Sequence, residues 1–304
     1  MPPSGDNLRL GRGTMDNISN ISEISSRKIQ KHTFLFVAIF HILSIGALFT
    51  FSWTNLIAFV VTWWIAGSLG IGLGYHRLLT HKGFKVSKPV EYFLTVCGTL
   101  ALQGGPLSWV TTHRIHHAFT ETDKDPHSPR AGFFWAHMGW IFKGGAQMHS
   151  PEVHKRYSPD LYKENLQHFL DTYYWLTTVL AGGILFAIGG WSMVLWGVFL
   201  RTVWGWHVTW FVNSVSHVWG ARRFETTDDS RNNPIIGILA WGEGWHNNHH
   251  AIPRSARHGL AWYEFDFNWI QILILEKLKI AKDIYAYDIK DTKNNLKQPL
   301  KKAA

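Results

Sequence analysis

Two long stretches of this chain contain no Asp, Glu, Lys or Arg. They run from Thr33 to Tyr75 and from Thr172 to Leu200. A transmembrane helix needs about 20 predominantly apolar residues, so each stretch has room for about two crossings. Turn-forming residues interrupt the stretches at 52–55 and at 189–190. The pattern therefore predicts four transmembrane helices, the last of which continues to about residue 217.

Basic residues lie on one side of the two predicted helix pairs. They precede and follow the first pair and recur near the C-terminus, whereas the two predicted turns carry no charge. Because Lys and Arg accumulate on the cytosolic side of membranes, we expect a multi-pass protein with both termini and residues 76–171 in the cytosol. The apolar segment Val90–Leu102 is too short to span a bilayer and is expected to form an interfacial or re-entrant helix.

Composition divides the chain into three parts. Residues 1–32 form a polar segment expected to be largely disordered, without a cleavable signal peptide; residues 33–280 form one membrane-embedded domain; residues 281–304 form a basic tail. The net charge of +9 comes from basic residues scattered along the predicted cytosolic faces. This distribution indicates contact with a lipid bilayer and with a protein partner, and not with nucleic acid.

Three short segments gather eight of the 18 histidines. They are His76-Arg-Leu-Leu-Thr-His81, His113-Arg-Ile-His116-His117 and His246-Asn-Asn-His249-His250. Positions i, i+3 and i+4 share one face of an α-helix, so each H-x-x-H-H segment is expected to aim all three imidazoles at one point. Neutral imidazole binds iron, zinc and copper, and eight or nine imidazoles exceed what one metal ion holds. Two metal ions are therefore expected, on the predicted cytosolic side.

The chemistry of the ligands narrows the function. No cysteine lies in these segments, which excludes a thiolate-bound zinc or an iron–sulfur cluster there, and the single Cys97 is expected to be a small buried side chain. Two irons held by imidazole can activate dioxygen and attack an unactivated C–H bond, and a site at the membrane surface would admit a hydrocarbon from the bilayer. A non-catalytic metal- or haem-binding membrane protein is the alternative of another class. It is less favoured because the uncharged stretches contain only His41, and a haem needs isolated axial ligands.

Two further motifs accompany the histidines: Gly104-Gly-Pro-Leu-Ser-Trp109 precedes the second segment, and Glu243-Gly-Trp-His246 opens the third. Over roughly residues 33–280 the chain resembles the membrane-bound fatty acyl desaturases, in particular their Δ9 (stearoyl-CoA desaturase-like) branch. The resemblance implies an all-α, mushroom-like bundle of four transmembrane helices whose cytosolic helical cap holds a di-iron centre. It also implies O2-dependent removal of two hydrogens from C9 and C10 of a saturated acyl chain, with electrons arriving singly from a carrier protein.

The resemblance also assigns ligands to the two irons. One would take His76, His81, His117 and His250, with Asn213 reaching it through water. The other would take His113, His116, His217, His246 and His249. His217 is included because Asn213-Ser-Val-Ser-His217 matches the family's Asn-x-x-x-His, whose spacing puts both residues on one helix face. The other nine histidines form no ligand-spaced set and receive no metal role, and Asp125 is a candidate acid behind the ligands.

The substrate-binding residues are likewise implied by the resemblance. The family's bent acyl tunnel is lined by a Gln, a Trp and a Thr, matched here by Gln103, Trp109 and Thr209. Its closed end lies two to three turns before the first histidine segment, where this chain has Ser68 and Trp64 on one helix face. This implies a tunnel suited to C16–C18 chains, with its floor at Trp64.

One departure bears on the substrate and leaves alternatives open. Animal acyl-CoA enzymes carry Arg-Asp directly before the second histidine segment, near the CoA head group, whereas this chain has Thr111-Thr112. Acyl-CoA and an acyl chain of a membrane lipid are therefore both candidate substrates. We expect a separate electron donor, either an acidic ferredoxin that suits the basic cytosolic face or cytochrome b5. Hydroxylation of an acyl chain or alkane, as in the same di-iron superfamily, is the alternative reaction.

Overall fold

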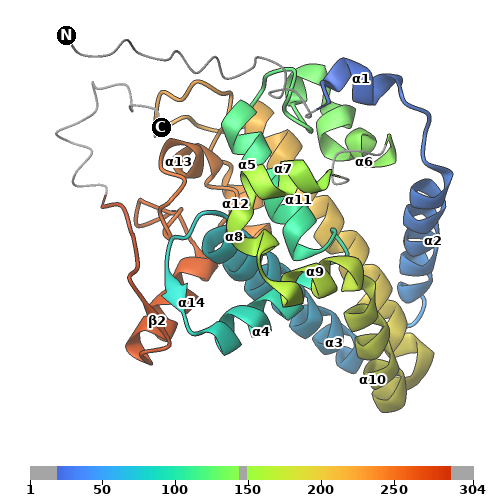
Figure 1. Cartoon of the computed structure of the whole chain (residues 1–304). Helices are drawn as coiled ribbons and strands as arrows, with labels where there is room; N and C mark the ends of the chain where they lie inside the picture. Colours follow the sequence, from blue (N-terminus) through green and yellow to red (C-terminus); the bar gives the residue numbers. More distant parts are fainter. Residues whose placement is uncertain (1–18, 144–148, 289–304) are drawn as a thin grey trace, which may run out of the picture.

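In the computed structural model, residues 19–143 and 149–288 are described, and their regular structure is almost entirely helical (Figure 1). The long apolar helices are α2 (Lys31–Ala47), α3 (Trp53–Trp63) continued by η1 (Trp64–Thr80), and α10 (Tyr174–Val194) continued by η4 (Leu195–Leu200) and α11 (Arg201–Val218). Short helices lie between them: α4 (Lys88–Thr99), α5 (Pro106–Phe119), η2 (Pro129–Ala131), η3 (Trp135–Gly139), α6 (Trp140–Phe142), α7 (Pro151–Tyr157), α8 (Pro159–Tyr162) and α9 (Asn165–Thr172). The remaining elements are α1 (Ile21–Ser26), α12 (Pro234–Leu239), α13 (His246–Ala251), α14 (Phe267–Lys277) and the antiparallel strands β1 (Lys85–Val86) and β2 (Ala281–Lys282).

Among the described residues, two continuous helical segments are long and apolar enough to cross a membrane, namely Trp53–Thr80 and Tyr174–Val218. The second segment reverses direction at Gly190, whose φ of 66° lies in the left-handed region that glycine adopts without a steric penalty. As a result, Leu185 of α10 packs against Gly197 of η4 across the reversal. The turn predicted at 189–190 is thereby confirmed. α2 is also apolar but has only 17 residues.

The predicted break at 52–55 lies a few residues earlier in the structure. α2 ends at Ala47, and α3 begins at Trp53 because Ser52 caps it. The Oγ of Ser52 accepts a hydrogen bond from the backbone N–H of Asn55 at 3.1 Å, which satisfies one of the unpaired N–H groups of the first helical turn. The Asn55 side chain also donates to the carbonyl of Thr50 at 2.8 Å. Residues 53–55 therefore belong to the helix and not to the turn.

The short helices α1, α5, α6, α7 and α13 gather at the end of the bundle opposite the reversal of α10 (Figure 1). α4 packs along η1, where the missing side chain of Gly70 lets the two backbones approach at Cys97. Leu94 and Cys97 of α4 are buried against the bundle, whereas Phe93 and Val96 are exposed. α4 thus has one face for the protein core and a second, apolar face directed outward.

Both segments that flank the predicted membrane-embedded domain contain regular structure. Part of the segment expected to be disordered forms α1, whose Ile21 N–H donates to the carbonyl of Asp123 at 2.7 Å. Part of the expected basic tail forms β2, in which Lys282 pairs with Lys85 of β1. Backbone hydrogen bonds to distant segments order these residues, and composition alone does not reveal such partners. Residues 1–18 and 289–304, which complete the two predicted segments, lie outside the described residues.

Candidate metal centre and adjoining cavity

The first two histidines lie at the end of η1, where the helix is wider than an α-helix. Five residues correspond to about 140° around an α-helix, which would turn His76 and His81 away from each other. Here the His81 N–H donates to the carbonyl of His76 at 3.1 Å, the i→i+5 bond of a π-helix. The two imidazole rings consequently lie with their centroids 4.8 Å apart. The wide turn is what brings this pair together.

The two H-x-x-H-H segments lie on α5 and α13, and each divides its imidazoles between two sites. On α5, His113 and His117 are four residues apart and point in one direction, while His116 points in another. Adjacent helical residues diverge by about 100°, so His116 and His117 cannot share a target. On α13, His246 and His250 form the corresponding pair and His249 points the other way. The expectation that each segment aims three imidazoles at one point is therefore incorrect.

Nine imidazoles meet in two groups. The five-histidine group consists of His76, His81, His113, His117 and His249. The four-histidine group consists of His116, His217, His246 and His250. The family resemblance implied that His113 and His249 share a metal with His217, and that His250 shares one with His76. In the structure, His113 and His249 lie in the group of His76, and His250 lies in the group of His217. The reason is the helical geometry of α5 and α13, each of which lies between the two groups.

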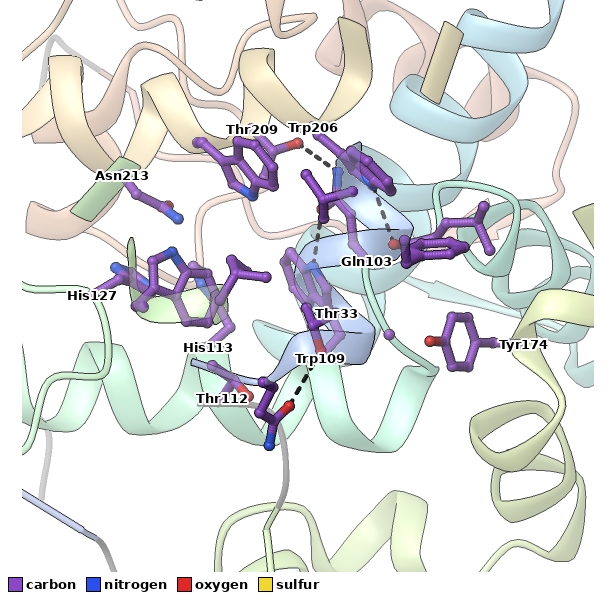
Figure 2. Close-up of a pocket in the computed structure, with 18 of the residues that line it drawn as sticks. Thr33, Gln103, Trp109, Thr112, His113, His127, Tyr174, Trp206, Thr209 and Asn213 are labelled. Atoms are coloured by element: carbon purple, nitrogen blue, oxygen red, sulfur yellow. Dashed lines mark hydrogen bonds between the residues drawn. The ribbon is translucent and has the colours of Figure 1, made fainter. Parts of the chain in front are cut away.

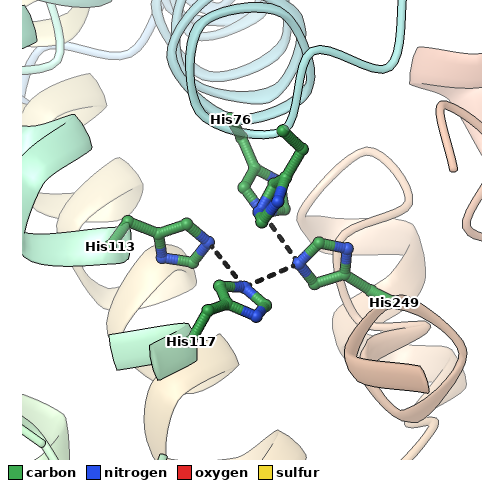
Figure 3. A group of neighbouring side chains, drawn as sticks. His76, His113, His117 and His249 are labelled. Atoms are coloured by element: carbon green, nitrogen blue, oxygen red, sulfur yellow. Dashed lines mark hydrogen bonds between the residues drawn. The ribbon is translucent and has the colours of Figure 1, made fainter. Parts of the chain in front are cut away.

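The nitrogen atoms in both groups converge as ligands of one cation would. In the five-histidine group, the Nε2 of His249 lies 3.1 Å from that of His76 and 3.0 Å from that of His117 (Figure 3). In the four-histidine group, the Nε2 atoms of His246 and His217 are 3.0 Å apart. With metal–nitrogen bonds of about 2.1 Å, two ligands at a right angle lie about 3.0 Å apart, and two at the tetrahedral angle about 3.4 Å apart. The observed spacing is therefore that of two nitrogen ligands of one metal ion.

Hydrogen bonding between the rings does not account for this arrangement. A ring nitrogen carries either one proton or one lone pair, so the Nε2 of His249 cannot bond well to two other imidazole nitrogens at once. Burial, and then the proximity of other imidazoles, holds the pKa of His81, His113, His117 and His249 well below its ordinary value. The rings are therefore neutral near pH 7, which is the form that binds metal ions. The donor set fits two metal ions.

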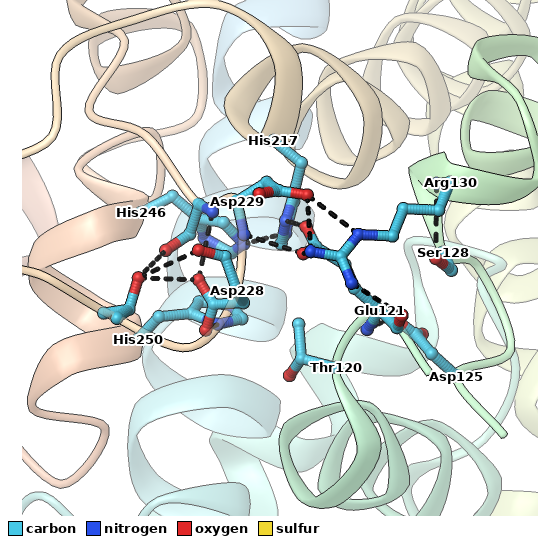
Figure 4. A network of polar contacts seen from close by, with 12 residues as sticks. Thr120, Glu121, Asp125, Ser128, Arg130, His217, Asp228, Asp229, His246 and His250 are labelled. Carbon is cyan, nitrogen blue, oxygen red and sulfur yellow. Dashed lines mark hydrogen bonds and ion pairs between the residues drawn. The ribbon is translucent and has the colours of Figure 1, made fainter. Parts of the chain in front are cut away.

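In four of these rings, the Nδ1 atom lies within hydrogen-bonding distance of a carboxylate. Asp125 lies 2.9 Å from the Nδ1 of His116, Glu121 lies 2.9 Å from that of His217, and Asp228 lies 3.0 Å from that of His250 (Figure 4). Glu243 lies 2.6 Å from the Nδ1 of His76. A carboxylate on Nδ1 fixes the tautomer and directs Nε2 at the metal position. Asp125, the acid that the sequence singled out, therefore lies directly against one ring of the four-histidine group.

Sequence reasoning did not single out Glu121 and Asp228. Glu121 lies four residues after His117, just beyond the end of α5, and this proximity in sequence could have suggested it, but Asp228 comes from a distant loop. Two histidines without an expected metal role also lie against the groups: His127 beside His116, and His258 beside His249, with ring centroids 4.3 and 4.4 Å apart. The Nδ1 of His258 is 3.1 Å from Glu243, so this carboxylate serves two imidazoles.

A cavity of about 500 Å³ adjoins the five-histidine group (Figure 2). His113 and Asn213 line it together with the three residues expected at the tunnel bend. The Nε2 of Gln103 donates to the Thr209 hydroxyl at 2.9 Å, and the Trp109 indole N–H is directed at the Oε1 of Gln103 at 3.4 Å. Leu102, with a φ of 52°, places Gln103 at this point through a backbone conformation that is uncommon for a residue other than glycine.

The structure places Trp64 and Ser68 away from this cavity, against α14. The buried Ser68 hydroxyl donates to the Oδ1 of Asn268 at 2.7 Å and accepts from the Nε2 of Gln271 at 2.6 Å. The Trp64 indole N–H donates to the Oε1 of Gln271 at 2.8 Å. Neither residue is among those that line the cavity. Their contacts join η1 to α14, and their expected role as the floor of a tunnel stays a prediction.

The threonine pair before the second histidine segment is also turned inward. The Thr111 hydroxyl lies 2.9 Å from the Nδ1 of His154 and donates to Ser158 at 2.9 Å. The Thr112 hydroxyl lies 2.8 Å from the Nε2 of His149. These contacts tie α5 to the segment around α7. The pair therefore supplies neither a positive charge nor an exposed donor for a CoA phosphate.

The fold and the site define a helical protein with two histidine-only candidate metal sites beside an apolar cavity. Residues 52–272 match the family described as fatty acid desaturase. The chain belongs to this family and is an oxidoreductase.

Several curated relatives are similar over most of their length. The chain is 46% identical over 255 residues to an sn-1 stearoyl-lipid 9-desaturase of Anabaena variabilis, which covers 82% of this chain and 92% of that protein. It is also 46% identical over 251 residues to an sn-2 palmitoyl-lipid 9-desaturase of Nostoc sp. (strain 36), covering 82% of this chain and 88% of the relative. An acyl-CoA 5-desaturase of Anemone leveillei is 43% identical over 244 residues, with coverages of 80% and 76%. Relatives at similar identity thus act on both acyl lipids and acyl-CoA.

Proposed function

We propose that this protein is a membrane-bound di-iron desaturase that introduces a cis double bond at the Δ9 position of a saturated acyl chain carried by a membrane lipid. The two histidine groups would each hold one iron, and Asn213, which lines the cavity with His113, would reach the five-histidine group through water. When bound, the two irons would supply the redox chemistry that couples reduction of dioxygen to the removal of two hydrogens.

The convergence of nine imidazoles beside an apolar cavity carries this proposal. The reaction consumes the saturated chain, one O2, two electrons and two protons, and yields the monounsaturated chain and two waters. The protein's own residues position the reactants: four carboxylates orient the imidazoles, and Gln103, Trp109 and Thr209 shape the wall beside which the chain bends. The two relatives with the highest identity given above act on acyl lipids, and the inward-facing Thr111-Thr112 pair agrees with such a substrate.

The proposal includes an arrangement in the membrane. Four crossings would be made by α2, by α3 with η1, and by the two halves of Tyr174–Val218 on either side of Gly190. Both termini and both histidine groups would lie on the cytosolic side, where basic residues flank the apolar helices. A separate one-electron carrier would then reach the site from the cytosol. An acidic ferredoxin suits the net charge of +9, and cytochrome b5 is the second candidate.

Expression in a host that makes no Δ9-unsaturated acyl chains tests the function. Gas chromatography of the total lipids should show a new Δ9 monounsaturated chain, and hydrolysis with a position-specific lipase should recover it from a glycerolipid. Hydroxylated chains without a new double bond would instead favour the alternative reaction. Unchanged lipids, in cells that contain the folded protein with its metal ions and a suitable carrier, would refute the proposal.

A further inference from the structure

We infer that the acyl chain enters the cavity sideways from the bilayer, through an opening between the first two turns of α2 and the first turn of α10. We call this opening the lateral entrance and define it by Thr33, Phe36, Tyr174 and Trp175. The inference rests on the proposed function and adds the route that the lipid takes. The head group would stay at the membrane surface while the chain alone enters the protein.

The exposure of the lining residues locates the opening. Phe36 and Trp175 line the cavity and yet are 41% and 49% exposed. In contrast, Gln103 and Trp206, which line the same cavity, are 8% and 3% exposed. The indole N–H of Trp206 donates to the carbonyls of Ala101 and Leu102, both at 3.1 Å, which fixes this wall in place. The cavity is therefore enclosed on the side of α4 and α11 and reaches the surface at α2 and α10.

The surface around the opening is apolar and borders a basic segment. Beside Phe36 on α2, Phe34 and Leu35 are 52% and 59% exposed, as expected for side chains in contact with lipid. Two basic residues, Arg27 and Lys28, lie just before α2, and a third, Lys31, is its first residue. A belt of aromatic side chains beside basic residues is typical of the boundary between bilayer and water. The lateral entrance thus lies at the depth where a lipid's acyl chain begins.

The polar residues at the opening suit a head group that remains outside. Gln30, His32 and Thr33 line this part of the cavity, and the Thr33 hydroxyl donates to the Oε1 of Gln30 at 3.2 Å. On α5, in contrast, Thr111 and Thr112 are buried and bond to His154 and His149. A chain attached to a large polar group therefore has a direct path from the bilayer.

Thiol labelling at matched positions tests the entrance. The native Cys97 is buried, and burial raises its pKa to about 12, so it should not react with a maleimide at neutral pH. Phe36→Cys and Trp175→Cys place a thiol at the entrance. Leu35→Cys and Val179→Cys place one at exposed positions of the same helices that do not line the cavity. Each variant is reconstituted in vesicles of stearoyl lipid and labelled with a bulky, membrane-permeant maleimide.

The quantity measured is the desaturation rate after labelling divided by the rate of the same variant before labelling. We expect this ratio to fall at least about tenfold for Phe36→Cys and Trp175→Cys, because the label obstructs the positioning of the chain, and to stay near one for Leu35→Cys and Val179→Cys. Bound iron per chain should not change. Labelled Phe36→Cys and Trp175→Cys enzymes that keep their rates would overturn the entrance alone. Wild-type enzyme that leaves stearoyl lipid unchanged before any labelling would overturn the proposed function, and the inference with it.

Discussion

Both histidine groups consist of imidazoles alone, but they differ in the number of carboxylates that bond to these imidazoles. In the four-histidine group, three of the four rings are bonded to carboxylates, those of Asp125, Glu121 and Asp228. In the five-histidine group, among the residues that the structure describes, only His76 is bonded to one, that of Glu243. Three negative charges beside one metal position and one beside the other would stabilise higher positive charge at the four-histidine group. The two proposed irons are therefore not equivalent.

The other difference is the distance from the substrate cavity. His113 of the five-histidine group lines the cavity, and no member of the four-histidine group does so in the part of the chain that the structure describes. The acids affect the pKa of one ring in particular. Burial lowers the pKa of His116, but the carboxylates of Asp125, Asp228 and Glu121 together raise it overall. Burial holds the pKa of His246 and His250, as of His113, well below its ordinary value. The group with few carboxylates thus borders the cavity through His113, and among the described residues the acid-rich group does not line it.

The largest expected effect is the loss of a ligand on the cavity side. His113→Ala should reduce desaturation by more than about a hundredfold and lower the bound iron, because it removes one of five converging nitrogens. His168→Ala is the matched control, since His168 bonds to the carbonyl of Tyr162 and belongs to neither group. Activity and iron are measured on purified protein. Full activity with two irons in His113→Ala would contradict the ligand assignment.

Removal of one carboxylate from each group should separate the two sites. We expect Asp228→Asn to weaken one of the two metal-binding steps about 10–100-fold and Glu243→Gln to weaken the other, because each acid orients a single ligand of its own group. Titration of the metal-free protein with Fe²⁺ would resolve the two steps. The comparison fails if both variants weaken the same step, since the groups would then act as one site.

A smaller effect is expected at the cavity wall. Gln103→Leu removes the hydrogen bond to Thr209, and we expect about a tenfold lower rate and a mixture of double-bond positions, because the chain is held less firmly beside His113. Gln271→Leu replaces another buried glutamine, outside the cavity, and should keep a single position. Mass spectrometry of derivatised products measures the position. A single Δ9 product from Gln103→Leu would show that other residues set it.

The smallest effect on the products is expected on η1, where the sequence had suggested a tunnel floor. Ser68→Ala removes two buried hydrogen bonds and should lower the free energy of unfolding by about 1–3 kcal/mol. Trp64→Ala should leave the distribution of product chain lengths unchanged, since Trp64 contacts Gln271 and does not line the cavity. Thermal unfolding and gas chromatography measure the two effects. A shift to longer product chains in Trp64→Ala would instead support Trp64 as the floor of the acyl tunnel.

Much of this protein can be predicted from its sequence because the relevant signals are local. The uncharged stretches indicate the apolar helices, Gly189-Gly190 marks the reversal, and the density of histidine identifies eight of the nine imidazoles that converge. These properties depend on residues that are close along the chain. Cys97 is buried as expected for the same reason, because it lies within an apolar run.

Only the tertiary structure decides how these parts combine. The histidines of α5 and α13 divide between two groups because of where each helix lies relative to the other histidines. The π-helical turn brings His76 and His81 together although residues five apart diverge on an α-helix. Asp228 reaches His250 from a loop, and Ser68 meets Asn268 of α14 across 200 positions of the chain. The helical period predicts which residues lie on one face of a helix. It does not predict which residues that face contacts, because these contacts depend on the packing of segments that are distant in sequence.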